Sequence, residues 1–362
     1  MNRAVSIKKL LGKNFDALLV SSTKNIIYLT GFNGFSNEER EAYLLLTKKN
    51  NYIFTDGRYS EVASRINGFK LIEISSGKNF KEVLGEIITK EKIQKLAIDE
   101  DNLKISEVIQ IKKVVKICPD ESLIEKLRMI KDEEEINNIK KACNLGDEVF
   151  KYILSEIKLG VTEKEIAKKI EIFILKNDAE ISFHPIVAFG QNSSSPHHVA
   201  SSRKLKKNET VLLDFGVKSE GNYCSDMTRT IFFGKATDEQ KRIYKTVLNS
   251  QQEAINFLKS SIINHQSVKG SEPDKIAREY IKSKGFPTIP HSLGHGIGLE
   301  VHEKPSLSPR RSEDMLQTGM VFSIEPGIYL PGFGGIRIED LVVFHKNGLE
   351  IITRANRDLI EL

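Results

Sequence analysis

Two acidic residues of the chain lie on either side of one predicted turn. The segment VLLDFGVKSEGNYCSDMTRT runs from Val211 to Thr230 and contains Asp214 and Asp226. The segment begins with an apolar run, continues through a polar stretch with a glycine, and ends in a stretch with β-branched residues. This pattern predicts a β-hairpin. A turn centred on Glu220 would place the two aspartates directly opposite each other, with Cβ atoms roughly 4.5 to 5.5 Å apart. Like charges in such a pair are destabilising, so a cation is expected between them.

A second predicted hairpin follows the same plan about a hundred residues later. The segment MVFSIEPGIYLPGFGGIRIED carries Glu325 on its first strand and Glu339 on its second, and a turn centred on Gly332 places them opposite each other. His295, flanked by glycines in GHGIG, lies between the two hairpins in the sequence. Four carboxylates and one imidazole predict a divalent metal site, and oxygen-rich ligands favour Mn²⁺ and its neighbours over thiolate-preferring metals.

These motifs resemble those of a known enzyme family. DFG, SDMTRT, HSLGHGIGLEVHE, SIEPGIY and RIED are similar to the pita-bread metallopeptidases, and within them to the proline-specific branch of aminopeptidase P (Xaa-Pro aminopeptidase) and prolidase (Xaa-Pro dipeptidase). TKNIIYLTGFNG and YIFTDGRYSEVA resemble the amino-terminal domain of the same branch. The resemblance implies a ribonuclease-H-like α/β domain of the creatinase amino-terminal type over residues 1–124. It implies an α+β pita-bread catalytic domain with pseudo-twofold symmetry over residues 125–362.

The resemblance also implies how the ligands share the metal. Asp214 would bind one ion, His295 and Glu325 the other, and Asp226 and Glu339 would bridge both. Two divalent ions are therefore expected, with Mn²⁺ favoured and Co²⁺ or Zn²⁺ as alternatives. Such a pair can lower the pKa of water and polarise the scissile carbonyl.

Further residues are assigned to catalysis and to the substrate by the same resemblance. His197 matches the catalytic histidine of the family, and with His302 it would stabilise the substrate carbonyl and the oxyanion. Glu325 would also transfer protons. The expected substrate-binding residues are His291 and Tyr329 in the proline pocket and Arg337, which can hold either a ligand carboxylate or the substrate bidentately.

One departure from the family lies between the two aspartates. The chain has one residue more there than is usual, and the extra residue falls in the polar turn near Gly221 and Asn222. Turns tolerate insertions, so the ligand assignment stands. A bulge at this point would make the direct facing of the aspartates only approximate.

The elements that position these residues have recognisable boundaries. A long amphipathic helix is expected from about Lys131 to before Gly160, and Thr162 with Glu165 forms a capping box for the next helix. Thr237 with Gln240 caps a third helix that extends to about Ile263, and a fourth runs from Ser271 to Gly285. The order helix, helix, hairpin thus occurs twice, which predicts a pseudo-twofold domain with the carboxylates at its centre.

The histidine-rich segment between the second helix pair and the second hairpin has two interpretations. His291, His295 and His302 are spaced by four and seven residues, as on one helix face. Gly294, Gly296 and Gly298 argue against a helix, because each glycine costs about 1 kcal/mol relative to alanine. An irregular strand, in which glycines allow the backbone to approach the metals, is the favoured interpretation.

The amino-terminal part shows strand candidates alternating with helical segments, which predicts an α/β domain with its own core. The strand candidates are DALLV, IIYL, YLLL, YIFT, KLIEI, KLAID and VVKIC, and residues 79–90 form a helical segment. No group of residues here forms a chemical constellation.

Composition excludes several other classes of protein. With 362 residues, 40% hydrophobic and 28% charged, the chain is long enough for about two domains. The net charge of +5 is spread among acidic residues and predicts no nucleic-acid binding. No signal peptide or membrane span is expected. Cys118, Cys143 and Cys224 lack disulfide or metal spacing, which predicts a cytoplasmic protein, and the family resemblance implies a homodimer.

Alternative functions remain on the same fold. The five ligands argue against a non-catalytic binding module, and the amino-terminal domain argues against methionine aminopeptidase. Between the two proline-specific activities, a dipeptidase must bind the free carboxylate beyond the proline ring, usually with a dedicated arginine. Arg337 belongs to the metal shell, and Arg310 and Arg311 are the remaining candidates. We therefore favour an Xaa-Pro aminopeptidase acting on peptides with proline second, with prolidase as the alternative.

Overall fold

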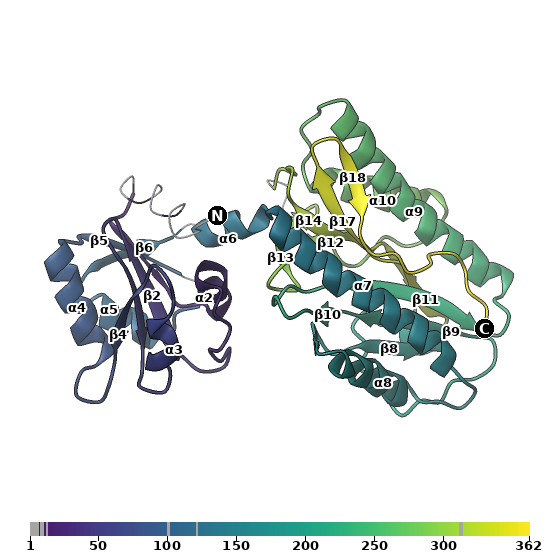
Figure 1. Ribbon diagram of the computed structural model, residues 1–362. Helices are drawn as coiled ribbons and strands as arrows, with labels where there is room; N and C mark the ends of the chain where they lie inside the picture. The colour runs from purple at the N-terminus through teal and green to yellow at the C-terminus, as the bar shows by residue number, and fades with distance from the viewer. Residues whose placement is uncertain (1–6, 8–10, 12–13, 100–101, 121, 311–313) are drawn as a thin grey trace. The chain divides into compact units, whose positions relative to one another are not determined.

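The computed structural model describes residues 7, 11, 14–99, 102–120, 122–310 and 314–362 (Figure 1). The chain forms two compact units, Met1–Arg128 and Met129–Leu362. Each unit has its own hydrophobic core. In the described part of the chain, no helix is long and apolar enough to cross a membrane.

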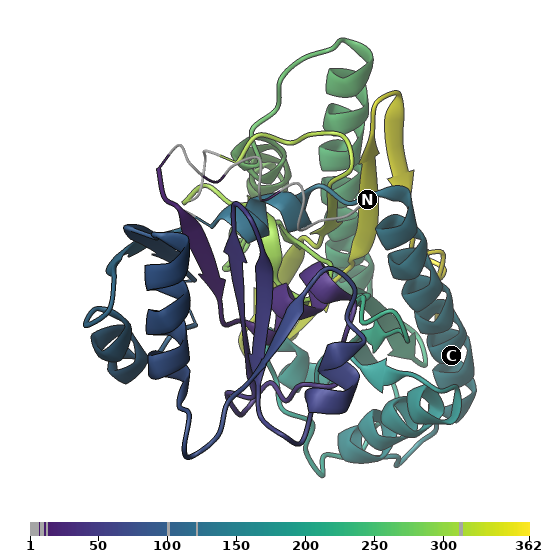
Figure 2. The ribbon, with the colours of Figure 1, turned by 60° about the vertical axis from the view of Figure 1, so that its left-hand side comes forward.

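The first unit is an α/β domain built on one six-stranded sheet, shown in purple and blue in Figures 1 and 2. The strand order is β4-β3-β2-β1-β5-β6, and the pairs β1–β2 and β2–β3 are antiparallel while the others are parallel. The strands are β1 (Ala17–Val20), β2 (Ala42–Thr47), β3 (Asn51–Thr55), β4 (Lys70–Glu73), β5 (Lys95–Ile98) and β6 (Lys116–Pro119). The helices are α2 (Thr23–Thr30), α3 (Ser60–Ser64), α4 (Phe80–Glu91), α5 (Ile105–Ile111) and α6 (Leu123–Met129).

One strand expected in this unit is a helix instead. The apolar run IIYL lies inside α2, so its prediction as a strand was wrong. Ser22 caps the start of α2 by accepting from the amide of Asn25, and Gly31 ends it in the left-handed region at φ 74°. These two end signals outweigh the strand preference of the isoleucines, because propensity is a weak prior against local capping and packing.

The second unit repeats a pair of helices followed by strands. The first half comprises α7 (Glu133–Glu156), α8 (Glu163–Lys176), β7 (Glu180–Ile181), β8 (Ile186–Phe189), the 3₁₀ turn η1 (Gly190–Ser194), β9 (Glu209–Phe215), β10 (Val217–Lys218) and β11 (Met227–Phe233). The second half comprises α9 (Asp238–Ile263), α10 (Ser271–Ser283), β12 (Gly294–Gly296), β13 (Glu303–Leu307), β14 (Val321–Ile324), β15 (Gly327–Leu330), β16 (Gly334–Arg337), β17 (Asp340–His345) and β18 (Gly348–Ile351). The order of two helices followed by strands, which the sequence predicts twice, is confirmed.

The helix starts follow the predicted capping boxes. Thr162 accepts from the amide of Glu165, and the Glu165 side chain accepts in return, at the start of α8. Thr237 and Gln240 form the equivalent pair at the start of α9. Helix α7 begins one residue after Asp132, which caps it, and ends at Glu156, before Gly160. The starts of these helices are therefore encoded locally.

The first hairpin forms with a register different from the expected one. Strands β9 and β11 pair antiparallel with Asp214 opposite Thr228, and Met227 is opposite Phe215. The turn is therefore centred one residue later than expected, and the direct facing of Asp214 and Asp226 was wrong. Because Asp226 precedes Thr228 by two residues, the aspartates remain diagonal neighbours on one sheet face, within reach of each other's side chains.

The second hairpin has the expected register. Gly327 is opposite Arg337 in the β15–β16 pair, and Ile324 is opposite Asp340 in the β14–β17 pair. Both pairings are centred on Gly332, so the intervening Glu325 and Glu339 lie opposite each other. The two hairpins meet where the amide of Glu339 donates to the carbonyl of Thr228 at 3.1 Å.

The GHGIG segment is an irregular strand. Strand β12 lies between β13 and β14, and its pairing with β13 shifts register between His295 and Gly296. The structure gives two of its glycines a further reason, because their nearest neighbours are backbone atoms of the adjoining strands. A Cβ on Gly294 would lie 1.9 Å from the carbonyl oxygen of Ser323, and one on Gly296 would lie 2.1 Å from that of Lys304. These glycines allow close packing of strands around His295.

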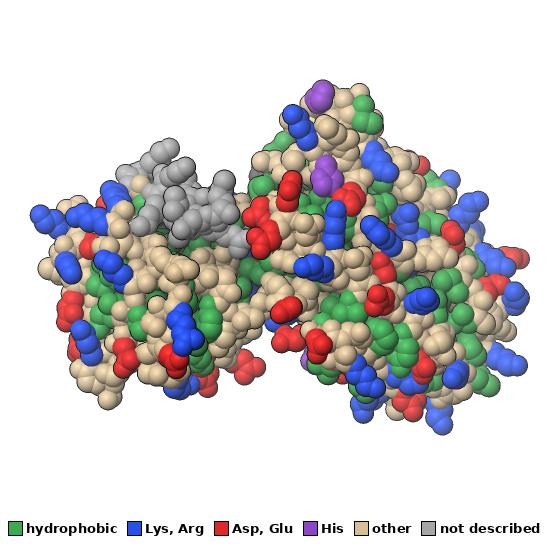
Figure 3. All heavy atoms as spheres, viewed as in Figure 1, with side chains coloured by type: hydrophobic (Ala, Val, Ile, Leu, Met, Phe, Trp, Pro, Cys, Tyr) green, Lys and Arg blue, Asp and Glu red, His purple; other side chains and the backbone are tan. Residues whose placement is uncertain are grey.

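Charged side chains of both signs are interspersed on the face shown in Figure 3. Cys118, Cys143 and Cys224, all within the described residues, form no disulfide, and the latter two are buried.

Candidate active site

Three of the predicted ligands gather around one point of the second unit. Asp226, His295 and Glu339 each offer a ligand atom, and these atoms lie within 4.8 Å of one another. Asp226 immediately precedes β11, His295 is the centre of β12, and Glu339 lies between β16 and β17. Residues far apart in the sequence are thus brought together because both hairpins and the irregular strand meet at the centre of the fold.

Glu325 and Asp214 complete the group of five. Oε1 of Glu325 lies 3.3 Å from Nε2 of His295, which is 3.7 Å from Oδ2 of Asp226. Asp214 lies on the same sheet face as Asp226 and is held by Arg337, whose Nη2 donates to Oδ2 at 2.5 Å. The structure therefore brings together all five residues that the sequence suggested as metal ligands.

The unpaired oxygens of this group fit a cation. Among the described residues, Oδ1 of Asp214, Oδ1 of Asp226 and Oε1 of Glu339 are buried and have no hydrogen-bond partner. A buried polar atom without a partner is destabilising by about 1 to 3 kcal/mol. Three such carboxylate oxygens beside one imidazole form an oxygen-rich donor set of the kind that divalent ions prefer. The residues present therefore fit the predicted metal.

The pKa values of two carboxyls in the metal-free group also indicate that a positive charge would stabilise it. Burial, and then repulsion from Glu325 and Asp214, raises the pKa of Glu339 well above its usual value. Burial, and then repulsion from Glu339 and Asp214, does the same to the pKa of Asp226. Without a cation the ionised forms of both carboxyls are destabilised, whereas a divalent ion would stabilise them.

Glu325 and His295 form an ion pair within the group. Burial opposes ionisation of Glu325, but the hydrogen bond and charge of His295 lower its pKa to about 2. Burial disfavours the imidazolium, yet the hydrogen bond to Glu325 and the charges of Glu325 and Glu339 raise the pKa of His295 to about 9. In the metal-free protein His295 therefore acts with Arg337 to neutralise part of the carboxylate charge, and a metal ion bound by its imidazole would displace the proton.

Arg337 holds two of the predicted ligands in place, Asp214 directly and Glu339 through Thr228. Its Nη2 is bound to Asp214, its Nη1 donates to the hydroxyl of Tyr329 at 2.8 Å, and its Nε donates to Oγ1 of Thr228 at 3.0 Å. Thr228 in turn donates to Oε2 of Glu339 at 2.7 Å. Arg337 is 3% exposed, so its guanidinium is committed to these partners.

His291 and Tyr329 lie together at the side of the ligand group. Nε2 of His291 is 2.9 Å from the hydroxyl of Tyr329, and its Nδ1 is 2.8 Å from the carbonyl of Ser292. Burial lowers the pKa of His291. The imidazole is thereby fixed in orientation and favours its neutral form, as a wall residue of an apolar pocket requires.

The ligand group opens into a cleft of about 630 Å³. His197, on the loop after η1, and His302, between β12 and β13, line this cleft together with the ligands. The ring of His302 lies 4.2 Å from that of His295, centroid to centroid. Burial and the nearby charge of His295 lower the pKa of His302 to about 4, so its imidazole is neutral at ordinary pH.

Sequence reasoning missed the residues that hold these groups in place. Thr228 bonds to Glu339, and Ser323 donates to Oε1 of Glu325 at 3.3 Å while accepting from the amide of His295 at 3.0 Å. Each lies two positions from a ligand along the chain, Thr228 after Asp226 and Ser323 before Glu325. Since side chains alternate along a strand, period-two neighbours of the ligands were the signal that could have identified them.

The His197 loop is also held by a residue that sequence reasoning passed over. Glu163, fully buried at the start of α8, accepts from Ser201, from the amide of Phe189 and from the side chain of Asn192, and it contacts His198 at 2.8 Å. His198 therefore belongs to the support of the loop, and His184 is exposed at the cleft rim.

Known proteins share this chain's sequence and fold over nearly its full length. Residues 137–346 match metallopeptidase family M24, and residues 6–130 match the creatinase/prolidase N-terminal domain. The Xaa-Pro dipeptidase of Pyrococcus horikoshii is 35% identical over 99% of this chain and 99% of its own length.

Two solved structures extend the comparison to three dimensions. The structure of an Xaa-Pro dipeptidase from Bacillus anthracis superposes with a TM-score of 0.90 and 36% identity, covering 99% of this chain and 98% of that one. The structure of an X-Pro aminopeptidase from Thermotoga maritima superposes with a TM-score of 0.87 and 34% identity, covering 99% and 100%. Both activity classes therefore occur among structures that differ little in identity and TM-score to this chain.

Proposed function

Because this chain belongs to metallopeptidase family M24 and carries a creatinase/prolidase N-terminal domain, we propose that it is a dinuclear-metal exopeptidase that hydrolyses the Xaa-Pro bond at the amino terminus of peptides. The observation that carries the proposal is the group of four carboxylates and one histidine, with three buried and unpaired oxygens, inside a cleft of about 630 Å³.

Five residues would hold the two ions. Asp214 would bind one, His295 and Glu325 the other, and Asp226 and Glu339 would bridge them. The ions, with Mn²⁺ favoured and Co²⁺ or Zn²⁺ as alternatives, supply Lewis acidity and activated water. The oxygen-rich donor set supports the preference for Mn²⁺.

The chain's own side chains position the substrate and move protons. Neutral His302, together with His197, donates hydrogen bonds to the oxygen that becomes negative when the scissile carbonyl is attacked. Glu325, which reaches the same cleft, accepts a proton from the attacking water and passes it to the departing proline nitrogen. That nitrogen must be protonated because the amine anion is a poor leaving group.

The proline specificity would reside in the pocket wall. His291 is fixed by Tyr329 and Ser292, and it presents a flat neutral ring at the cleft. A pyrrolidine ring is rigid and apolar, so a preformed wall binds it with little loss of conformational entropy.

The charges in the cleft support an aminopeptidase over a dipeptidase. Arg337 is the sole arginine or lysine among the described residues that line the cleft, and it is already bound to Asp214 and Tyr329. Arg310 does not line the cleft, and Arg311 lies outside the described residues. A dipeptidase needs a cation for the free carboxylate beyond the proline ring, whereas an aminopeptidase needs that direction open. We expect a homodimer in the cytoplasm, and the absence of a disulfide among the three described cysteines is consistent with that compartment.

Peptide length tests this proposal. We expect the Mn²⁺-loaded protein to cut Ala-Pro-Ala at the Ala-Pro bond with a kcat/KM at least equal to that for Ala-Pro. Cleavage of Ala-Pro alone would identify a prolidase. Cleavage of neither peptide by protein shown to contain metal would refute peptidase activity.

A further inference from the structure

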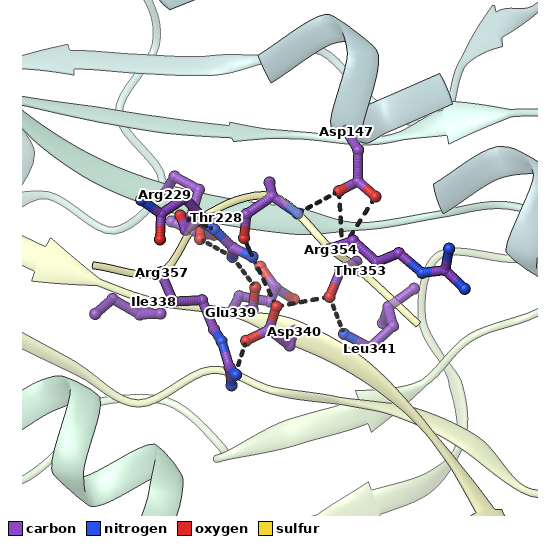
Figure 4. A network of polar contacts seen from close by, with 12 residues as sticks. Asp147, Thr228, Arg229, Ile338, Glu339, Asp340, Leu341, Thr353, Arg354 and Arg357 are labelled. Carbon is purple, nitrogen blue, oxygen red and sulfur yellow. Dashed lines mark hydrogen bonds and ion pairs between the residues drawn. The ribbon is translucent and has the colours of Figure 1, made fainter. Parts of the chain in front are cut away.

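We propose that Arg229, Gln251 and Asp340 form a buried positioning network that fixes the ligand-bearing strands to the C-terminal segment, residues 353–357, and thereby sets the affinity for the metal ions. The inference rests on the proposed function, because it assumes the metal centre. The network lies behind the ligands: Arg229 follows Thr228 on β11 and Asp340 follows Glu339, so alternation along each strand turns both side chains away from the cleft. Figure 4 shows the side chains of Arg229 and Asp340 meeting from separate strands.

Arg229 uses every donor of its guanidinium. Nη1 donates to the carbonyls of Thr228 and Glu339, Nη2 to Oδ1 of Asp340 at 2.7 Å and to the carbonyl of Ala355 at 2.9 Å, and Nε to the carbonyl of Asn356 at 3.1 Å. The guanidinium carries five N–H groups, and all five have acceptors. Arg229 is 1% exposed. Only a planar fork of this shape can hold two ligand-bearing strands and the C-terminal segment at once.

Asp340 is the acceptor at the centre of the network. Its Oδ1 accepts from Arg229 and from Oγ1 of Thr353 at 2.6 Å, and its Oδ2 accepts from Nε2 of Gln251 at 3.0 Å and lies 3.6 Å from Nη1 of Arg357. Asp340 is fully buried, and it is the residue immediately after the bridging ligand Glu339. These contacts therefore hold the chain at the position next to Glu339.

Gln251 brings the third ligand strand into the network. It projects from α9 and is fully buried, and its Nε2 donates to the carbonyl of Ile324 at 2.9 Å and approaches that of Ile338 at 3.4 Å. Ile324 precedes the ligand Glu325, and Ile338 precedes the ligand Glu339. One amide group therefore connects the backbone beside both glutamates.

The C-terminal segment is itself anchored on α7. The carboxylate of Asp147 accepts from the amides of Arg354 and Ala355, at 3.0 Å and 2.7 Å from its Oδ1. The same segment offers the carbonyls of Ala355 and Asn356 to Arg229. The ligand strands thus share one buried set of polar contacts with α7, α9 and the segment at residues 353–357.

This arrangement differs from general core support in what it touches. Arg229 donates to the carbonyl of Glu339 itself, and Gln251 donates to or approaches the carbonyls of the residues that precede Glu325 and Glu339. Groups that orient metal ligands without touching the metal typically change metal affinity by about 10- to 100-fold when they are removed. A core contact that serves stability alone would lower the melting temperature without this change.

Two substitutions with matched controls test the inference. Gln251→Leu removes the amide contacts while keeping a side chain of similar size, and Gln252→Leu makes the same change one position along α9, where the side chain bonds to Asn256 near the surface. Asp340→Asn removes the central charge, and Asp358→Asn makes the same change at an exposed position. For each protein, Mn²⁺ binding to the chelator-treated full chain is measured by calorimetry, with the melting temperature recorded on the same sample.

We expect Mn²⁺ affinity to fall by about 10-fold or more in Gln251→Leu and Asp340→Asn and to stay near the wild-type value in both controls. If Asp340→Asn fails to fold, the Gln251 pair decides alone. Wild-type affinity in folded Gln251→Leu, even with a lower melting temperature, would overturn the network's role and leave the proposed function intact. Failure of the wild-type protein to bind Mn²⁺ would overturn the metal centre and this inference together.

Discussion

The melting temperature should depend strongly on divalent metal, because the metal-free site is a source of instability. Three buried carboxylate oxygens lack partners, and the pKa values of Asp226 and Glu339 are raised by burial and mutual repulsion. An ion that binds only the folded state adds about 2.7 kcal/mol when its free concentration is 100 times its dissociation constant. A domain of the size of Met129–Leu362 responds by about 2 to 4 °C per kcal/mol. One occupied site should therefore raise the melting temperature by about 5 to 11 °C, and two should give about twice that.

The assay is a thermal melt of chelator-treated protein titrated with Mn²⁺, followed by circular dichroism. Asp226→Asn and Glu339→Gln should lose most of the Mn²⁺-induced shift. Their metal-free forms should melt at or above the metal-free wild type, because each substitution removes one of the mutually repelling buried carboxylates. Asp358→Asn, at an exposed position, should behave like the wild type. The reasoning would be refuted if Mn²⁺ did not change the melting temperature of the wild type. It would also be refuted if Asp226→Asn and Glu339→Gln both showed the full Mn²⁺-induced shift.

Two further predictions concern the histidines. His197→Ala and His302→Ala should retain both ions by metal analysis. Their kcat should fall by about 10²- to 10³-fold, as it does when an oxyanion donor is lost. Loss of metal from either folded variant would show that the replaced histidine is a metal ligand instead. In the metal-free protein the pKa of His295 is raised to about 9 from an ordinary value of 6.5, so its stabilising contribution is complete below pH 6.5 and disappears as the pH rises to 9. Melts across this range should show falling stability in the chelated protein and rising Mn²⁺ affinity, and a pH-independent affinity would contradict the assignment of His295 as a ligand.

Local signals in the sequence predicted most element boundaries and one of the two hairpins. The capping boxes at Thr162 and Thr237 identify helix starts because they satisfy backbone amides with nearby side chains. The register of the second hairpin follows from the glycine-rich turn centred on Gly332. Such features depend on residues within a few positions of each other, so the sequence is sufficient to predict them.

Features that depend on distant neighbours were predicted less well. The first turn is polar throughout, and nothing local distinguishes a centre at Glu220 from the observed centre one residue later. Gly294 and Gly296 are required by the carbonyls of Ser323 and Lys304, which no nearby residue indicates. The same holds for Arg229 and Gln251, whose partners lie between 73 and 127 residues away in the sequence, apart from the adjacent Thr228.

Product analysis of two tripeptides by mass spectrometry tests the central claim most directly. Protein stripped of metal, the same protein restored with Mn²⁺, and Glu339→Gln restored in the same way are each incubated with Ala-Pro-Ala and with Ala-Ala-Ala. We predict that the restored wild type alone releases alanine and Pro-Ala from the first peptide and leaves the second largely intact. Cleavage that survives metal removal, or equal cleavage of Ala-Ala-Ala, would contradict a metal-dependent, proline-specific peptidase.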